Sequence, residues 1–247
     1  MSAAIDRLHP SPLAALDDDT LLALYSAETS EPWLRVNFVS SIDGAVTREG
    51  VSGALGGDAD ERVFDLLRRL ADVVLVAAGT VRTEGYGPMV LGEESAAARS
   101  AEGRPAHPVF AIVSGSLELD PASRIFTEAP VRPVVVTTGA SPARRRAELA
   151  EVADVLICGE EDLDAVRMRD ALADRGLARI HCEGGPGLLG TLLSQDVVDE
   201  LDLTVSPTLE AGDGGRIARG EAEARTQRLA HVLASGDTLL LRYLRAR

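Results

Sequence analysis

The most regular feature of the chain is a series of short apolar runs, rich in Val, Ile and Leu, that alternate with longer polar or mixed segments. A continuous apolar run of about four to eight residues is typical of a strand buried on both faces of a parallel sheet. Asp43-Gly44 and Gly79-Thr80 end the first two runs, as expected where a strand passes into a loop. The pattern predicts strands at residues 33–40, 72–78, 109–113, 133–138, 154–158, 179–183, 200–207 and 236–244.

Between several of these runs, apolar residues recur at helical spacing. Residues 58–70 form the clearest amphipathic segment, and Asp58 is expected to be its N-cap. Further helices are predicted at residues 17–26, 162–175 and 188–196, and Gly176 is expected to end the third helix along the chain. The segments 85–106 and 212–223 are long and polar, and we interpret them as functional or mobile loops.

Strands that alternate with helices predict an α/β fold of three layers, α/β/α, around a mostly parallel sheet. The last two predicted strands have no helix between them, so the sheet is expected to be mixed at that edge. We expect one main domain at residues 33–247, preceded by an N-terminal extension at residues 1–32 that packs on it.

Composition narrows the classes of function. A formal net charge of −14 disfavours non-specific binding to nucleic acid or to an anionic membrane surface. The sequence has no apolar run of about 18 residues and no signal-peptide pattern, which predicts a cytoplasmic protein with reduced thiols. Two Cys and four His residues lack metal-ligand spacing, so we expect no metal site.

Ligands of parallel sheets bind beyond the carboxyl ends of the strands. The sequence places Gly79-Thr80, Ser114-Gly115 and the segment 183–191 (EGGPGLLGT) at such positions. A strand, glycines and then a helix point backbone N–H groups at an anion, although a tight turn with Pro186 opening the helix is the alternative. Arg68 is a candidate phosphate ligand or a partner of the helix dipole. The run 144–146 (RRR) is either a 2′-phosphate site or a charged helix face.

Taken in order, the segments 39–45 (VSSIDGA), 77–82 (AAGTVR), 183–193 (EGGPGLLGTLL) and 198–209 (VDELDLTVSPTL), together with the helix that carries Arg68, resemble the reductase domain of riboflavin-biosynthesis proteins. The resemblance extends from about residue 32 to residue 247. It implies a dihydrofolate-reductase-like fold, NADPH as cofactor and a homodimer. It also implies reduction of the ribose of 5-amino-6-(5-phosphoribosylamino)uracil.

The resemblance also implies roles for individual residues. Asn37, Ser52, Arg68 and Glu183 are expected to meet the substrate, with Arg68 at its phosphate and Glu183 as the catalytic group. Asp43 is interpreted as structural. The cofactor is expected to contact Val39, Gly79, Thr80, Glu84, Ser114, Gly115, Gly184, Gly185, Pro186, Gly187, Leu188 and Leu189.

The chain departs from the family pattern in the half expected to bind substrate. Asn37 stands where many members have Lys, and Ala54 lies where they have Trp. The segment 84–88 (EGYGP) replaces a D-[DN]-P motif. The zinc-deaminase signatures of bifunctional members are missing, which predicts a stand-alone reductase.

Three hypotheses follow. The first is an NADPH-dependent oxidoreductase that transfers hydride to a phosphorylated pyrimidine, with Glu183, water or the substrate itself as the proton donor. The second is a reductase of a pterin such as dihydrofolate, whose mark is an acid on the helix after the first strand. The available acids are Asp58, Asp60, Glu61 and Asp65. The third is a protein that binds NADPH without catalysis.

Overall fold

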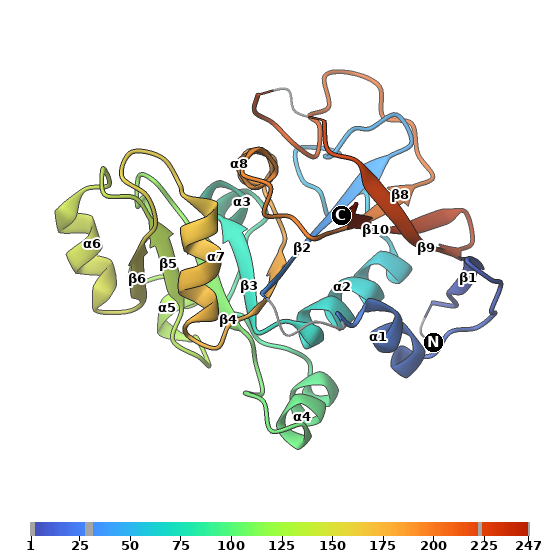
Figure 1. Ribbon diagram of the computed structural model, residues 1–247, viewed down its shortest axis with the longest axis horizontal. Coiled ribbons are helices and arrows are strands. Elements are labelled where there is room, and N and C mark those ends of the chain that lie inside the picture. Colours follow the sequence, from blue (N-terminus) through green and yellow to red (C-terminus); the bar gives the residue numbers. More distant parts are fainter. Residues whose placement is uncertain (1–2, 28–31, 222–223, 247) are drawn as a thin grey trace.

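The computed structural model describes residues 3–27, 32–221 and 224–246, and these residues form one ten-stranded sheet in the order β1-β9-β10-β8-β2-β7-β3-β4-β5-β6. Figure 1 shows the sheet running from β6 on the left to β1 on the right. The seven strands from β8 to β6 in this order are parallel to one another. They are β8 (Glu200–Ser206), β2 (Trp33–Ser41), β7 (Arg179–Cys182), β3 (Val73–Ala77), β4 (Val109–Val113), β5 (Val134–Thr137) and β6 (Asp154–Ile157).

The other edge of the sheet is antiparallel. β10 (Thr238–Arg245) pairs with β8 and with β9 (Gln227–Ser235), and β9 pairs in turn with β1 (Asp6–His9). A strand that follows another through a short turn can pair with it only in the antiparallel sense. The predicted mixed edge is therefore confirmed.

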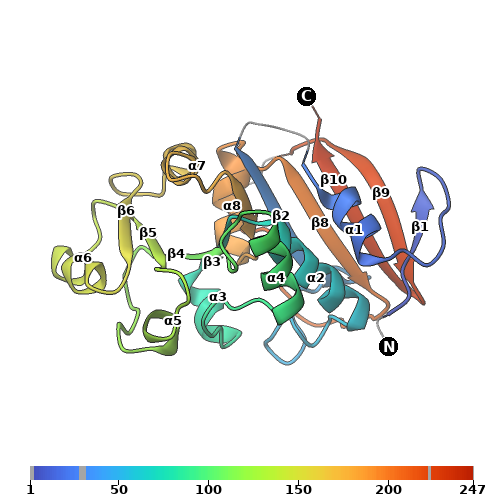
Figure 2. The same ribbon diagram turned by 90° about the horizontal axis from the view of Figure 1, so that it is seen from below.

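Helices cover both faces of the sheet because alternate residues of the central strands point to opposite sides. Val73 and Leu75 contribute to the core beneath α7 (Ala165–Ala173) and α8 (Pro186–Ser194). Val74 and Val76 pack in the core that includes residues of α3 (Ala78–Thr83), α5 (Arg124–Thr127) and α6 (Ala143–Ala150). Figure 2 shows α7 and α8 on one side of the sheet and α3 and α5 on the other, which is the predicted three-layer arrangement.

The N-terminal segment belongs to the same sheet and packs in a hydrophobic cluster of its own beside α2 (Asp58–Leu70). Its helix α1 (Asp18–Tyr25) lies beside α2 and is capped by Asp17, whose Oδ1 accepts a hydrogen bond from the Thr20 amide at 2.9 Å. Leu21 and Tyr25 of α1 join Leu233 of β9 and Leu240 of β10 in a third hydrophobic cluster. The segment therefore covers the face of the sheet next to α2.

Most predicted elements are present within one to three residues of their predicted ends, and the prediction of residues 58–70 as a helix is confirmed. Its N-cap, however, is Gly57 rather than Asp58, which lies in the first turn as a charge favourable to the helix dipole. The helix α7 ends at Ala173 with Asp174 as its C-cap, earlier than predicted, and Gly176 follows in the turn with a φ of +76°.

Several elements were missed. The segment 85–106 contains α4 (Glu93–Ala101), so its prediction as a loop is wrong. Only four of the nine α4 residues are apolar, so the sequence lacks the apolar spacing that indicates a helix. The strands β1 and β9 and the helices α3, α5 and α6 also lacked a clear pattern. No helix within the described ranges is both long and apolar enough to cross a membrane.

Candidate active site

A cavity of about 430 Å³ lies at the carboxyl ends of β2, β7 and β3, between the sheet and α2. The loop after β2, the turn of α3 and the start of α8 complete its walls. Nine of the residues predicted to bind ligand line it: Asn37, Val39, Ser52, Arg68, Thr80, Glu84, Glu183, Gly185 and Pro186. Residues distant in sequence are therefore brought to one place, as expected for the edge of a parallel sheet.

One face of α2 forms a wall of the cavity. Asp60, Phe64 and Arg68 all line it, and they are spaced four residues apart, so they lie one above another on the helix. The Arg68 guanidinium lies 4.2 Å from the centre of the Phe64 ring, which is a cation–π contact. This face carries a carboxyl, an aromatic ring and a guanidinium in series.

Arg68 and Glu183 form a bidentate pair. The Arg68 Nε donates to Glu183 Oε1 at 2.6 Å, and its Nη2 donates to Oε2 at 2.9 Å. The Tyr86 hydroxyl donates to the same Oε2 at 2.8 Å, and the Tyr86 ring stacks on Phe110. The side chain of Glu183 is 1% exposed. Both carboxylate oxygens are therefore engaged by protein groups.

These contacts set the ionisation of the cluster. Burial by itself raises the pKa of Glu183, but Arg68, followed by the nearby His181, lowers it to about 2. Burial, followed by the charge of Glu183, raises the pKa of Tyr86. Burial lowers the pKa of His181, against the opposing effect of Glu183, whose Oε1 lies 3.5 Å from His181 Nε2. At neutral pH the cluster holds an ionised Glu183, a cationic Arg68 and a neutral Tyr86.

The glycine turn after β7 brings the backbone close to α3. Gly184 has a φ of +95°, a region that favours glycine, and a Cβ on Gly185 would collide with the Thr80 Oγ1. In α8, the Leu189 amide donates to the Gly185 carbonyl at 3.0 Å. The amides of Gly187 and Leu188 precede this first helical bond and have no acceptor within the helix. They are the groups available to an anion at this end of α8.

Other residues predicted to bind cofactor lie outside the cavity. The side chains of Leu188 and Leu189 are buried in the core under α8, so only their backbone faces the turn. Gly79 lies inside α3. Ser114 and Gly115 follow β4, next to β3 in the sheet, and the Ser114 Oγ accepts a hydrogen bond from the Leu117 amide. An extended ligand that starts in the cavity and follows the strand ends passes Ser114 and Gly115.

Three hydrogen bonds fix the loop after β2. The Ser52 amide donates to Glu84 Oε1 at 2.9 Å, which joins this loop to the end of α3. Asp43 accepts hydrogen bonds from the Ser41 hydroxyl at 2.5 Å and from the Ala211 amide at 2.8 Å. The interpretation of Asp43 as structural agrees with these contacts.

The fold and the position of the cavity invite comparison with known proteins. A family model described as the RibD C-terminal domain matches residues 32–241. The chain belongs to this family. The match covers the parallel part of the sheet and every residue that lines the cavity.

Individual proteins also resemble the chain over most of its length. A protein of Archaeoglobus fulgidus named 2,5-diamino-6-ribosylamino-4(3H)-pyrimidinone 5′-phosphate reductase is 26% identical over 83% of this chain and 94% of its own. The crystal structure of a pyrimidine reductase-like protein of Corynebacterium diphtheriae is 29% identical, with a TM-score of 0.82, over 92% of this chain and 98% of its own. A Thermotoga maritima protein named as a deaminase and 5-amino-6-(5-phosphoribosylamino)uracil reductase shares the fold, with 20% identity and a TM-score of 0.63, over 87% and 57% of the two chains.

Three residues that line the cavity were not predicted from the sequence as specific site residues. Tyr86 lies in the segment that departs from the family motif, and Phe64 was not singled out. Asp60 was only one of four available acids. The spacing of Asp60, Phe64 and Arg68 on α2 was a usable signal, because it predicts one shared face. Tyr86 had no such signal, since its contact with Glu183 joins residues 97 positions apart.

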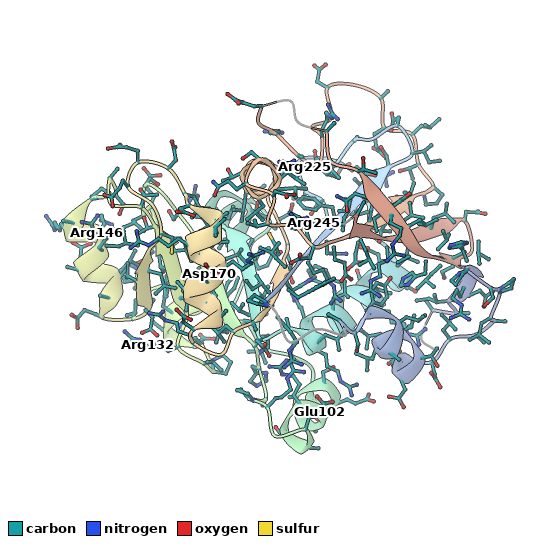
Figure 3. The ribbon with its side chains drawn as sticks, viewed as in Figure 1. Glu102, Arg132, Arg146, Asp170, Arg225 and Arg245 are labelled. Atoms are coloured by element: carbon teal, nitrogen blue, oxygen red, sulfur yellow. The ribbon has the colours of Figure 1, made fainter. Side chains whose placement is uncertain are left out.

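The structure has a second cavity of about 610 Å³ beside the C-terminal segment, and it contains none of the predicted site residues. Figure 3 labels two of its arginines, Arg225 and Arg245. Both lie within ion-pair distance of Asp196. On α6, Arg144 and Arg145 pair with Glu148, as expected of a charged helix face.

Proposed function

We propose that the protein is an NADPH-dependent reductase that acts on a ribosylaminopyrimidine 5′-phosphate, the reaction class of riboflavin biosynthesis. The observation that carries the proposal is the meeting of two features in one cavity. The glycine turn at the start of α8 supplies an anion-binding backbone, and the Arg68–Glu183–Tyr86 cluster supplies polar groups to a substrate beside it. The names of the relatives support the same reaction class.

The backbone at α8 fits the paired phosphates of a dinucleotide. Thr80 and Gly185 approach each other so closely that a side chain at Gly185 would fill the space. The amides of Gly187 and Leu188 provide donors at the positive end of α8. We propose that Val39, Thr80, Glu84, Gly184, Gly185 and Pro186 hold the nicotinamide half, while Gly79, Ser114, Gly115 and the α8 residues 187–189 lie along the remainder.

The chemistry supplied by a bound nicotinamide is hydride transfer to the carbon of a C=N or C=O bond. Glu183 is ionised, so it is not a proton donor at neutral pH, and the proton comes from water or from the substrate. In our proposal Glu183 fixes Arg68 and Tyr86, which present a cation and a polarised phenol to the substrate. Asn37 and Ser52 complete the substrate wall.

The test is NADPH oxidation, followed by absorbance, with 2,5-diamino-6-ribosylamino-4(3H)-pyrimidinone 5′-phosphate and with its aminouracil counterpart. NADH is run in parallel. We expect turnover of a ribosylaminopyrimidine with NADPH and a lower kcat/KM with NADH. Binding of NADPH without turnover of either substrate would contradict the proposal and favour a binding protein.

A pterin reductase is the second candidate, because one observation favours it. Asp60, on the helix after the first parallel strand, lines the cavity, and this is the acid position that the pterin hypothesis requires. Dihydrofolate is therefore assayed beside the two pyrimidines. A higher kcat/KM for dihydrofolate would replace the first proposal with this one.

We also propose a homodimer that forms through the sheet face opposite α1 and α2. On this face β8, β10 and β9 align three apolar rows across the strands: Val205–Leu239–Ala234, Leu203–Leu241–Val232 and Leu201–Tyr243–Leu229. All nine side chains stay at least partly exposed. Antiparallel strands that face water usually carry polar residues there, so this face suits burial against a second copy.

A further inference from the structure

Asp60 is a carboxyl group placed in the cavity without a cation. It lies on α2 one turn before Phe64, and the ion pairs that the structure describes do not include it. The guanidinium on the same helix face, that of Arg68, is already bound by both oxygens of Glu183. The acceptor capacity of Asp60 is therefore available to a ligand.

The surroundings keep the Asp60 carboxyl in place. A Cβ on Gly56 would lie only 2.7 Å from Asp60 Oδ2, so the loop leaves space for this carboxyl because residue 56 is glycine. Burial raises the pKa of Asp60, and the nearby Thr204 of β8 partly offsets this effect. Phe64, the next cavity residue along the helix, offers an aromatic surface to a planar ligand.

We propose that Asp60 is the residue that selects the pyrimidine ring, and that it selects a ring with a 2-amino group over one with a 2-oxo group. This inference rests on the proposed function and names the ring that the protein prefers. Two rings occur among the relatives, a 2,5-diaminopyrimidinone and a 5-aminouracil, and they differ at C2.

Hydrogen-bond complementarity explains the choice. In the 2-amino-4-oxo ring, the 2-amino group and the neighbouring N3–H are two adjacent donors, which match the two acceptor oxygens of a carboxylate. In the uracil ring the same edge presents the N3–H donor beside the C2 carbonyl acceptor. A carboxylate would then face a carbonyl oxygen, which leaves one acceptor unpaired and repelled.

The experiment measures ring binding rather than turnover. Calorimetry on the whole 247-residue chain, saturated with NADP⁺, compares 2,5,6-triaminopyrimidin-4(3H)-one with 5,6-diaminouracil, two bases that differ only at C2. We expect the 2-amino base to bind about tenfold tighter or more, since the mismatch removes one charge-assisted hydrogen bond. Equal affinities, tighter binding of the uracil, or no binding of either base would overturn the proposal.

Asp60→Asn provides the decisive variant. The amide offers one acceptor and one donor, which match the N3–H and C2 carbonyl of the uracil edge, so we expect the preference to vanish or reverse. Asp58→Asn is the matched control, because Asp58 lies on the same helix, is exposed and does not line the cavity. An Asp60→Asn protein that retains the wild-type preference would show that another residue reads C2.

A second variant covers the case in which Asp60→Asn does not fold. Gly56→Ala leaves Asp60 intact but forces its carboxyl to move, and we expect weaker binding of the 2-amino base, with less change for the uracil. The readout separates this inference from the proposed function. Ring selection without NADPH oxidation would contradict the proposed reaction only, and oxidation with no ring selection would contradict the role of Asp60 only.

Discussion

Gly185 lies where the turn after β7 comes closest to Thr80. Its φ is −89°, a backbone conformation that alanine adopts readily, so a substitution there tests space rather than strain. We expect Gly185→Ala to weaken NADPH binding about tenfold or more, because the new Cβ collides with the Thr80 hydroxyl and displaces the cofactor cradle. Fluorescence titration with NADPH measures the effect.

Gly92→Ala is the control for this substitution. Gly92 directly precedes α4 and does not line the cavity, and a Cβ there has no atom within 4 Å. We expect a fold and an NADPH affinity close to those of the wild type. If Gly185→Ala bound NADPH as tightly as Gly92→Ala, the cofactor would have to lie elsewhere.

The ion pair of Arg68 and Glu183 is expected to contribute to the free energy of unfolding. Arg68→Met leaves the carboxylate of Glu183 buried without its cation, which costs about 3–5 kcal/mol. Arg69→Met is the control, because the nearest acid, Glu102, lies 3.9 Å from the Arg69 guanidinium, and its loss costs less than about 1 kcal/mol. Urea denaturation of the three proteins measures the difference.

The pair of Arg68 and Glu183 also determines how the free energy of unfolding changes with pH. The pKa of Glu183 is about 2 in the folded protein against an ordinary value of 4.5, so the unfolded chain binds the proton first as pH falls. The stabilisation, about 3 kcal/mol, is present above pH 4.5 and is lost between pH 4.5 and 2. In Arg68→Met this acid-induced loss should shrink; an unchanged loss would mean that Arg68 does not set the pKa of Glu183.

At the scale of elements, a buried ion network joins three strands to α1. Arg35 of β2 and Arg242 of β10 each donate to Glu200 Oε1 on β8 at 2.8 Å. Arg35 also donates to the carbonyl of Tyr25, and Arg242 to that of Leu24, at the end of α1. Cations at a helix C-terminus are favourable, so the network fastens the N-terminal helix to the sheet.

His231 of β9 packs edge-on against Tyr25 of α1, with the ring centres 4.8 Å apart, and it provides a pH test of this attachment. Burial, followed by the charge of Arg242, lowers the pKa of His231 to about 4. The unfolded chain therefore binds a proton from about pH 6.5 while the folded protein does not. Stability should fall by up to about 3 kcal/mol as pH falls from 6.5 to 4.

His231→Asn isolates this contribution, because Asn does not titrate in the window. Free energies of unfolding measured at pH 7 and pH 4.5 should differ less in the variant than in the wild type. Comparing the change with pH, rather than the free energies themselves, removes the pH-independent cost of the packing that His231→Asn loses. Equal slopes would contradict the pKa assigned to His231.

At the scale of the whole molecule, the apolar face of β8, β10 and β9 predicts self-association. Leu241 lies in its middle row, between Leu203 and Val232. The wild type should have the mass of a dimer of 26.0 kDa chains by light scattering, and Leu241→Asp should convert it to monomer, because a charge would be buried in the interface.

Val90→Asp is the control for the dimer, since Val90 is 55% exposed in the segment before α4 and away from this face. It should leave the mass unchanged. A wild-type protein that is monomeric at micromolar concentration would contradict the interface.

Much of the fold could be predicted because its signals are local. The strands β3, β4 and β5 are continuous apolar runs, and α2 has apolar residues at helical spacing, so neither needs knowledge of its neighbours. In contrast, β1 and α4 lack such patterns. Their place depends on pairing with β9 and on packing beside α2, which are tertiary contacts.

The candidate site also has one part that local sequence predicts and another that depends on tertiary contacts. The sequence alone determined that Glu183 and the glycine turn would stand at a strand end, since a strand, glycines and a helix are consecutive in the chain. Only the tertiary structure decided what Glu183 does there, because Arg68 and Tyr86 reach it across separations of 115 and 97 residues. The packing of distant segments against one another, rather than any local pattern, engaged both oxygens of Glu183 and left Asp60 without an ion pair among the residues that the structure describes.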